Sequence, residues 1–142
     1  MNKESQLASN LIRAYQVTNF IVTDEPEFIL KVGMESEELK KLFTQNRVDS
    51  AAFITAWNPF SESLSMEENQ TRNVNLENEL NLRSLKFIDG FGQDPLGQWD
   101  GEESFLVLGI SLEASKKLGA QFEQNAIVWS DKEAIPQLII LR

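Results

Sequence analysis

The sequence predicts an α+β domain in which three or four helices pack on a mainly antiparallel sheet. Two patterns support this: strand-length apolar runs alternate with segments of helical period, and neighbouring strands are joined by connections too short for a parallel crossover. The chain has 142 residues, of which 42% are hydrophobic and 25% charged. We therefore expect one globular domain spanning residues 1–142.

The N-terminal third predicts a helix followed by a β-hairpin. Apolar residues recur at intervals of three and four over residues 7–15, as in an amphipathic helix. Residues 17–23 and 28–32 are rich in β-branched and aromatic side chains, which favour strands. The polar connection between them is too short for a crossover, so the two strands should pair antiparallel.

The middle of the chain predicts two helices on either side of a buried strand. Helical spacing of apolar residues indicates a helix over residues 37–45, and the almost continuous apolar run at 51–57 indicates the strand. Ser65 and Glu68 have the spacing of a capping box. A long helix should therefore begin there and end near residue 83.

The C-terminal part predicts short strands around one more helix. The segment 89–101 holds four Gly, one Pro and three Asp, which is typical of a long turn or loop. The other expected elements are strands at 86–88, 103–110, 126–129 and 137–141 and a helix at 112–124. We expect the helices to cover one face of the sheet.

Composition excludes several classes of function. The chain has no Cys and no His, which rules out disulfides, imidazole or thiolate metal ligands and Ser-His-Asp triads. The net charge of −9 and the scattered basic residues disfavour nucleic-acid binding through a basic surface. No apolar run is long enough for a membrane span, and the absence of Cys fits a reducing cytoplasm. We expect a cytoplasmic protein.

A polar stripe on the predicted long helix is the first candidate site. Asn69, Asn73, Leu76 and Leu80 fall on one helical stripe, with Arg72 at its margin. Because the leucines must face the core, the amides and the guanidinium also point inward, where polar groups need partners. These side chains either satisfy backbone groups of the preceding loop or form a polar pocket for a carboxylate, phosphate or amide group. Both interpretations stay open.

A second candidate site is acidic. Asp94, Asp100, Glu102 and Glu103 surround Trp99 in the sequence, and carboxylate oxygens suit hard cations such as Mg²⁺. The spacing matches no known calcium-loop pattern, and acidic residues at a strand entrance usually keep an edge solvated. No cofactor is expected, with Mg²⁺ as the alternative. Glu102 and Glu103 point to opposite faces of a strand, so only one of them can join a given pocket.

Several short motifs resemble one protein family. They comprise residues 55–59, then Asn69 with Arg72 and the two leucines, then Trp99 with residues 102–105, and finally residues 122–126. Together they resemble the small bacterial family called domain of unknown function 3293, over about residues 15–129. The chain departs from the pattern at Glu123, where a Gly is expected. The resemblance implies no activity. It implies only that the Asn-Pro loop, the helix start, Glu103 and Gln124 belong together.

The leading functional hypothesis is a non-catalytic binding or regulatory domain whose polar pocket holds a small anionic or amide-bearing ligand. The predicted ligand-binding residues are Asn58, Asn69, Arg72, Asn73, Glu103 and Gln124, with Arg72 as the anchor. One alternative is a carboxylate-based, Mg²⁺-dependent hydrolase or transferase with Glu103 as the base. Another is an acidic module that binds a protein or mimics nucleic acid. The apolar last strand could also support a homodimer.

Overall fold

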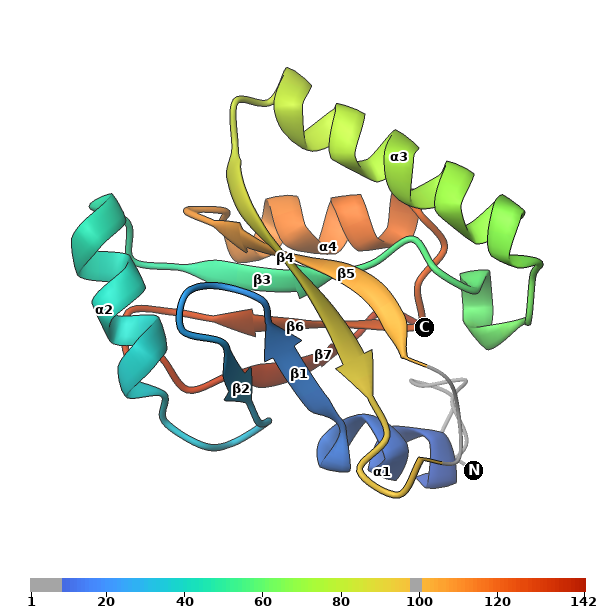
Figure 1. Ribbon diagram of the computed structural model, residues 1–142, viewed down its shortest axis with the longest axis horizontal. Helices are drawn as coiled ribbons and strands as arrows, with labels where there is room; N and C mark the ends of the chain where they lie inside the picture. Colours follow the sequence, from blue (N-terminus) through green and yellow to red (C-terminus); the bar gives the residue numbers. More distant parts are fainter. Residues whose placement is uncertain (1–8, 98–100) are drawn as a thin grey trace.

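The computed structural model describes residues 9–97 and 101–142, and the predicted elements follow one another in the predicted order (Figure 1). The α+β class and the mainly antiparallel sheet are confirmed. The elements are α1 (Ser9–Val17), β1 (Asn19–Val22), β2 (Phe28–Leu30), α2 (Glu37–Asn46), β3 (Ala51–Ile54), the short 3₁₀ helix η1 (Pro59–Ser61), α3 (Met66–Leu82), β4 (Lys86–Gln93), β5 (Glu102–Leu108), α4 (Leu112–Gln121), β6 (Ala126–Ser130) and β7 (Gln137–Ile140).

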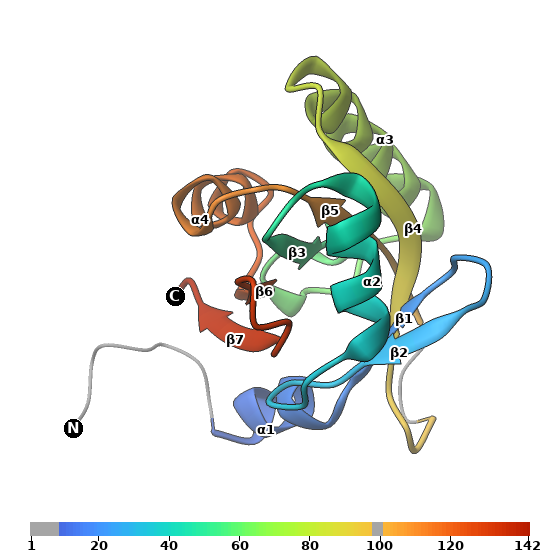
Figure 2. The same ribbon diagram turned by 90° about the vertical axis from the view of Figure 1, so that its left-hand side faces the viewer.

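The strands form a single, strongly curved antiparallel sheet. Their order is β2-β1-β4-β5-β3-β6-β7, so the N-terminal hairpin lies at one edge and β7 at the other. Figure 2 shows the strands curving around α2. At one end the curve almost closes, because the amides of Gly33 and Ser36, after β2, donate to the carbonyls of Pro136 and Ala134, before β7, at 2.8 and 2.9 Å. The sheet therefore has a concave inner face and a convex outer face.

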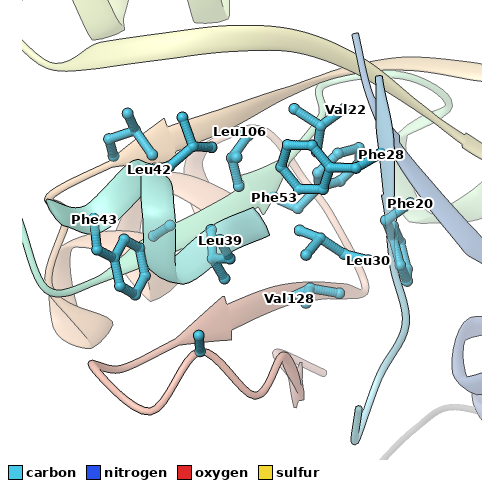
Figure 3. Close-up of a cluster of buried hydrophobic side chains, with 13 residues drawn as sticks. Phe20, Val22, Phe28, Leu30, Leu39, Leu42, Phe43, Phe53, Leu106 and Val128 are labelled. Carbon is cyan, nitrogen blue, oxygen red and sulfur yellow. The ribbon is translucent and has the colours of Figure 1, made fainter. Parts of the chain in front are cut away.

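Helices cover both faces of the sheet, and the prediction that they cover only one is wrong. On the inner face, α2 packs Leu39, Leu42 and Phe43 into one cluster with Phe53 and other strand residues (Figure 3). On the outer face, α3 and α4 contribute a second cluster of buried residues, namely Leu76, Leu80 and Leu118 with Ala52, Ile54, Phe105, Val107 and Ile127. Because β3 and β5 are apolar on both sides, each side needs a cover.

Strand β4 is longer than predicted. The segment Asp89–Gln93 continues the strand that was expected to end at Ile88, and it pairs with β1 on one side and β5 on the other. Gly90 and Gly92 were interpreted as loop glycines, but they are buried in this strand and face inward, where neighbouring strands approach closely. Glycines in a strand often mark a bend or close approach rather than a turn. The loop prediction for these five residues is wrong for that reason.

The two glycines of β4 should respond differently to alanine. A Cβ at Gly90 would lie 2.4 Å from the carbonyl oxygen of Ile21, whereas a Cβ at Gly92 would meet nothing closer than Thr18 Cγ2 at 3.7 Å. We expect Gly90→Ala to destabilise the protein by about 2 kcal/mol or more, as overpacking does, and Gly92→Ala to change stability little. Urea unfolding of both variants tests this, and equal stabilities would contradict it.

The start of the long helix agrees with the prediction, whereas the end of the last helix does not. The capping box is confirmed, since the Ser65 hydroxyl accepts from the Glu68 amide and the Glu68 carboxylate accepts from the Ser65 amide. The last helix was expected to reach residue 124 but ends at Gln121, because Glu123 adopts a left-handed φ of 59°. No helix in residues 9–97 and 101–142 has both the length and the hydropathy that a membrane span requires.

Candidate functional site

A cavity of about 700 Å³ lies on the inner face of the sheet, beside the cluster packed by α2. Phe20, Phe53 and Val128, drawn in Figure 3, belong both to that cluster and to the cavity wall. Residues of α1, η1 and the first part of α3 also contribute to the lining, and none comes from α2. Its other lining residues include Leu11, Ala14, Tyr15, Thr18, Thr55, Trp57, Asn58, Ser61, Asn69, Gly92, Glu102, Ser104, Gln124 and Leu138.

Glu102 is the acidic side chain of the cavity. It is the first residue of β5 and pairs with Gly92 of β4, whose missing side chain leaves space beside it. Burial raises the pKa of this carboxyl from its ordinary 4.5 to about 7, and a hydrogen bond from Asn58 opposes the rise. Near neutral pH the group therefore exchanges easily between its protonated and its ionised form.

Asn58 aims its amide nitrogen at Glu102. Its Oδ1 accepts from the Leu64 amide at 3.0 Å and from Asn69 Nδ2 at 2.8 Å, so this atom must be the oxygen. Its Nδ2 then donates to Glu102 Oε2 over 3.4 Å. The backbone of Asn58 is left-handed, with a φ of 46°. The loop between β3 and α3 thus directs one hydrogen-bond donor, Asn58 Nδ2, at the Glu102 carboxyl group.

The two asparagines of α3 bind backbone groups of that loop. Asn69 Oδ1 accepts from the Asn58 amide at 2.7 Å. Asn73 Oδ1 accepts from the Ala56 amide at 2.9 Å, and its Nδ2 donates to the Glu103 carbonyl at 2.8 Å. Both side chains are buried, as the predicted inward stripe required, but only Asn69 lines the cavity. Their hydrogen bonds fit the backbone-satisfying interpretation of the stripe.

Arg72 is bonded within the protein rather than directed into the cavity. Its Nε donates to the Ala56 carbonyl at 2.7 Å and its Nη2 to the Phe122 carbonyl at 2.5 Å. Its Nη1 lies 3.3 Å from Glu123 Oε1. The guanidinium therefore joins the end of β3 to the end of α4, and Arg72 is absent from the cavity lining. The predicted ligand anchor therefore does not line the cavity.

The remaining predicted site residues are divided between the two faces. Gln124 is buried in the cavity wall, where its Nε2 donates to the carbonyls of Trp57 and Phe122 at 3.3 and 3.2 Å. Glu103 has an exposed side chain and does not line the cavity. Its carbonyl, however, accepts from Thr55 Oγ1 at 2.6 Å. The cavity thus brings together Asn58, Asn69 and Gln124, but not Arg72, Asn73 and Glu103.

Tyr15 reaches the same cavity from the N-terminal helix. Burial, the largest influence, raises the pKa of this phenol above 10.0. Ser61 and Asn125 act on its hydroxyl to lower the pKa, whereas the charge of Glu102 raises it. Asn125 also connects η1 to the C-terminus, since it donates to Ser61 Oγ at 2.8 Å and accepts from Arg142 at 3.1 Å.

The acidic candidate site is only partly described. Asp100 and Trp99 lie outside the described residues, and Asp94 is buried, with its carboxylate accepting from the Leu96 amide at 3.2 Å. Within residues 9–97 and 101–142, no three acidic side chains gather closely enough to hold a metal ion. The expectation of no cofactor, with Mg²⁺ as the alternative, stays a prediction.

Sequence reasoning missed two features of the cavity. It identified Glu102 only as part of the acidic group, and it gave no role to Tyr15. The signal appears only once the strands are paired, because Glu102 and Ser104 on one face of β5 then oppose Gly92 and Gly90 on β4, and the glycines leave space. Nothing local indicated that α1 would cover this space.

Comparison with known families agrees with the resemblance seen in the sequence. The model of a family described as "Protein of unknown function (DUF3293)" matches residues 54–127. The match covers the end of β3, all of α3, β4, β5 and α4, and the start of β6, and is shorter than the expected range of about 15–129. No curated protein and no solved structure gives a significant match.

Proposed function

Since the chain belongs to the DUF3293 family, whose description names no activity, we propose a function from the cavity itself: the protein is a binding domain that holds a small molecule on the inner face of its sheet. The cavity carries this proposal. A volume of about 700 Å³ suits a small organic ligand, and the mixture of aromatic walls with a few converging polar groups is typical of ligand sites.

The polar groups favour a ligand that forms hydrogen bonds over an anionic one. The anionic ligand expected from the sequence depended on Arg72, whose three nitrogens all have partners within the protein. No Lys or Arg is among the described residues that line the cavity, whereas Glu102 is. An anion would therefore meet a carboxyl group without a compensating cation, while a neutral amide-bearing molecule would find polar partners.

Filling the cavity should abolish binding without unfolding the protein. The space next to Gly92 accepts a Cβ, so Gly92→Leu should place its side chain among the lining residues Thr18 and Phe20. We expect ligands found in a thermal-shift screen of amines, amides and carboxylic acids to lose most of their affinity for this variant. Gly92→Ala, which adds one methyl group, is the matched control and should retain binding. Ligands bound equally by all three proteins would contradict the proposal.

The carboxyl also supports a second candidate function. A pKa of about 7 suits a general acid or base at neutral pH, and the Tyr15 hydroxyl is a potential partner in proton transfer. The carboxylate-based enzyme considered from the sequence would then use Glu102 in place of Glu103. Following bound ligands by NMR over time distinguishes the two functions, because only an enzyme converts its ligand.

A further inference from the structure

We propose that the ligand of this cavity is a small organic cation, whose ammonium, amidinium or guanidinium group pairs with Glu102 while its apolar part lies against the aromatic wall. This inference rests on the proposed binding function and names the ligand class. Three independent features of the cavity support it: its charge, the direction of its hydrogen bonds and its aromatic rings.

The described residues that line the cavity carry negative charge and no positive charge. Among the described residues that line the cavity, Glu102 is the sole Asp, Glu, Lys or Arg. Its one hydrogen bond from a described residue, that from Asn58, is long at 3.4 Å. An ionised carboxylate can accept about four hydrogen bonds, and a buried one is costly unless it is paired. A cationic ligand would supply both the charge and the donors that the surrounding protein does not.

Three hydroxyl groups of the cavity, those of Thr18, Thr55 and Ser104, are oriented as acceptors. Thr18 donates to the Ala14 carbonyl at 2.6 Å, Thr55 to the Glu103 carbonyl at 2.6 Å, and Ser104 to the Glu102 carbonyl at 2.9 Å. Since a hydroxyl has a single proton, each of these oxygens can only accept a bond from a ligand.

The amide donors of the lining are committed in the same way. Asn58 donates to Glu102, Asn69 to the Asn58 side chain, and Gln124 to two backbone carbonyls. These hydroxyl and amide groups leave more acceptors than donors toward the cavity, which favours a ligand that donates. Ammonium, amidinium and guanidinium groups donate and do not accept.

Aromatic rings and the overall charge favour the same ligand. Tyr15, Phe20, Phe53 and Trp57 line the cavity, and the faces of such rings attract organic cations. The net charge of −9 raises the concentration of cations near the protein and lowers that of anions. A basic group on an apolar body therefore fits the whole cavity.

A set of three probes of nearly identical shape tests the charge of the ligand. Benzamidine, benzamide and benzoate differ chiefly in charge, from positive through neutral to negative, and the same three head groups on a butyl chain vary the apolar part. Titrations followed by calorimetry and by amide NMR shifts at about pH 8 keep Glu102 largely ionised. We expect the amidines to bind about tenfold or more tightly than the amides, and the carboxylates weakest.

Variants at two neighbouring positions test whether the preference for cationic probes comes from Glu102. Glu102→Gln should reduce the affinity of the amidines to that of the amides, whereas Glu103→Gln removes the same charge from the opposite face of β5 and should leave the preference intact. Gly92→Leu should abolish amidine binding. Because the order of the probes is measured on the unmodified protein, the test does not depend on the folding of any variant.

Each contrary result has a separate meaning. Amides or carboxylates that bind more tightly than amidines, with binding lost in Gly92→Leu, would overturn the cationic ligand and leave the proposed function standing. Amidine binding that survives both Glu102→Gln and Gly92→Leu would place the cation outside the cavity and overturn the inference. Absence of binding by every probe at millimolar concentration would count against both the inference and the proposed function.

Discussion

Replacement of Arg72 by alanine is expected to lower the free energy of unfolding by about 3 kcal/mol. The side chain is 22% exposed and donates to the carbonyls of Ala56 and Phe122. Alanine would remove both hydrogen bonds, and bonds from a charged group contribute about 1.5–3 kcal/mol each. The Ala56 carbonyl would lose this donor, whereas the Phe122 carbonyl would keep the bond from Gln124 Nε2 at 3.2 Å. The ion pair with Glu123 adds little, because the Glu123 carboxylate is half exposed. Urea unfolding monitored by circular dichroism measures the loss.

Arg83→Ala, at the C-cap of the same helix, is the matched control. The Arg83 guanidinium makes a surface ion pair with Glu79 at 3.0 Å, one turn away, and such a pair contributes only about 0.3–0.5 kcal/mol. Arg72→Lys should recover only part of the lost stability. Its ammonium group keeps the charge but cannot reach both carbonyls and the carboxylate as a planar guanidinium does. An unchanged stability of Arg72→Ala together with lost ligand binding would instead support Arg72 as a ligand anchor.

Glu102 is expected to make the protein less stable as the pH rises from about 4.5 to about 7. In this window the folded protein holds a proton on Glu102 that the unfolded chain has released, so raising the pH favours unfolding. Above about pH 7 the loss of stability caused by Glu102 is constant, and it amounts to at most about 3 kcal/mol. Among the described residues that line the cavity, Tyr15 is the other titratable group, and its raised pKa keeps it neutral throughout the window.

Comparison with Glu102→Gln separates the pH dependence of stability that Glu102 causes from that of the other carboxyl groups. The variant cannot ionise at this position, so its stability relative to the natural chain should increase from about pH 4.5 to 7 and then level off. Glu103→Gln, one residue along the strand with an exposed side chain, is the matched control for the loss of one carboxyl group. Thermal unfolding of all three proteins across this pH range gives the curves. A Glu102→Gln difference that does not change with pH would contradict the raised pKa.

Part of the candidate site could be predicted because it depends on the geometry of one helix. Asn69, Asn73, Leu76 and Leu80 share a stripe of α3, and all four are buried as the spacing required. The same periodicity placed Arg72 at the edge of the stripe, where its long side chain reaches backbone carbonyls. Helical spacing indicates which side chains turn inward, but not whether they meet backbone or ligand.

The choice between Glu102 and Glu103 could not be made from the sequence. Strand alternation placed them on opposite faces, and this is confirmed by the buried neighbours of each, since Ser104 lines the cavity and Phe105 joins the outer cluster. Both faces of β5 carry apolar residues and are covered by helices. The sequence therefore does not show which face borders a cavity. That space depends on how β4 pairs with β1 and on where α1 lies.

The sequence by itself determined the order and type of the elements, the capping of α3 and the absence of His and Cys chemistry, because these depend on composition and on residues a few positions apart. Only the tertiary structure decided that Gly90 and Gly92 lie in a strand, that helices cover both faces and that Glu102 lies in a cavity with Tyr15. These features arise from pairing between distant segments and from the curvature of the whole sheet. Local periodicity contains no information about either.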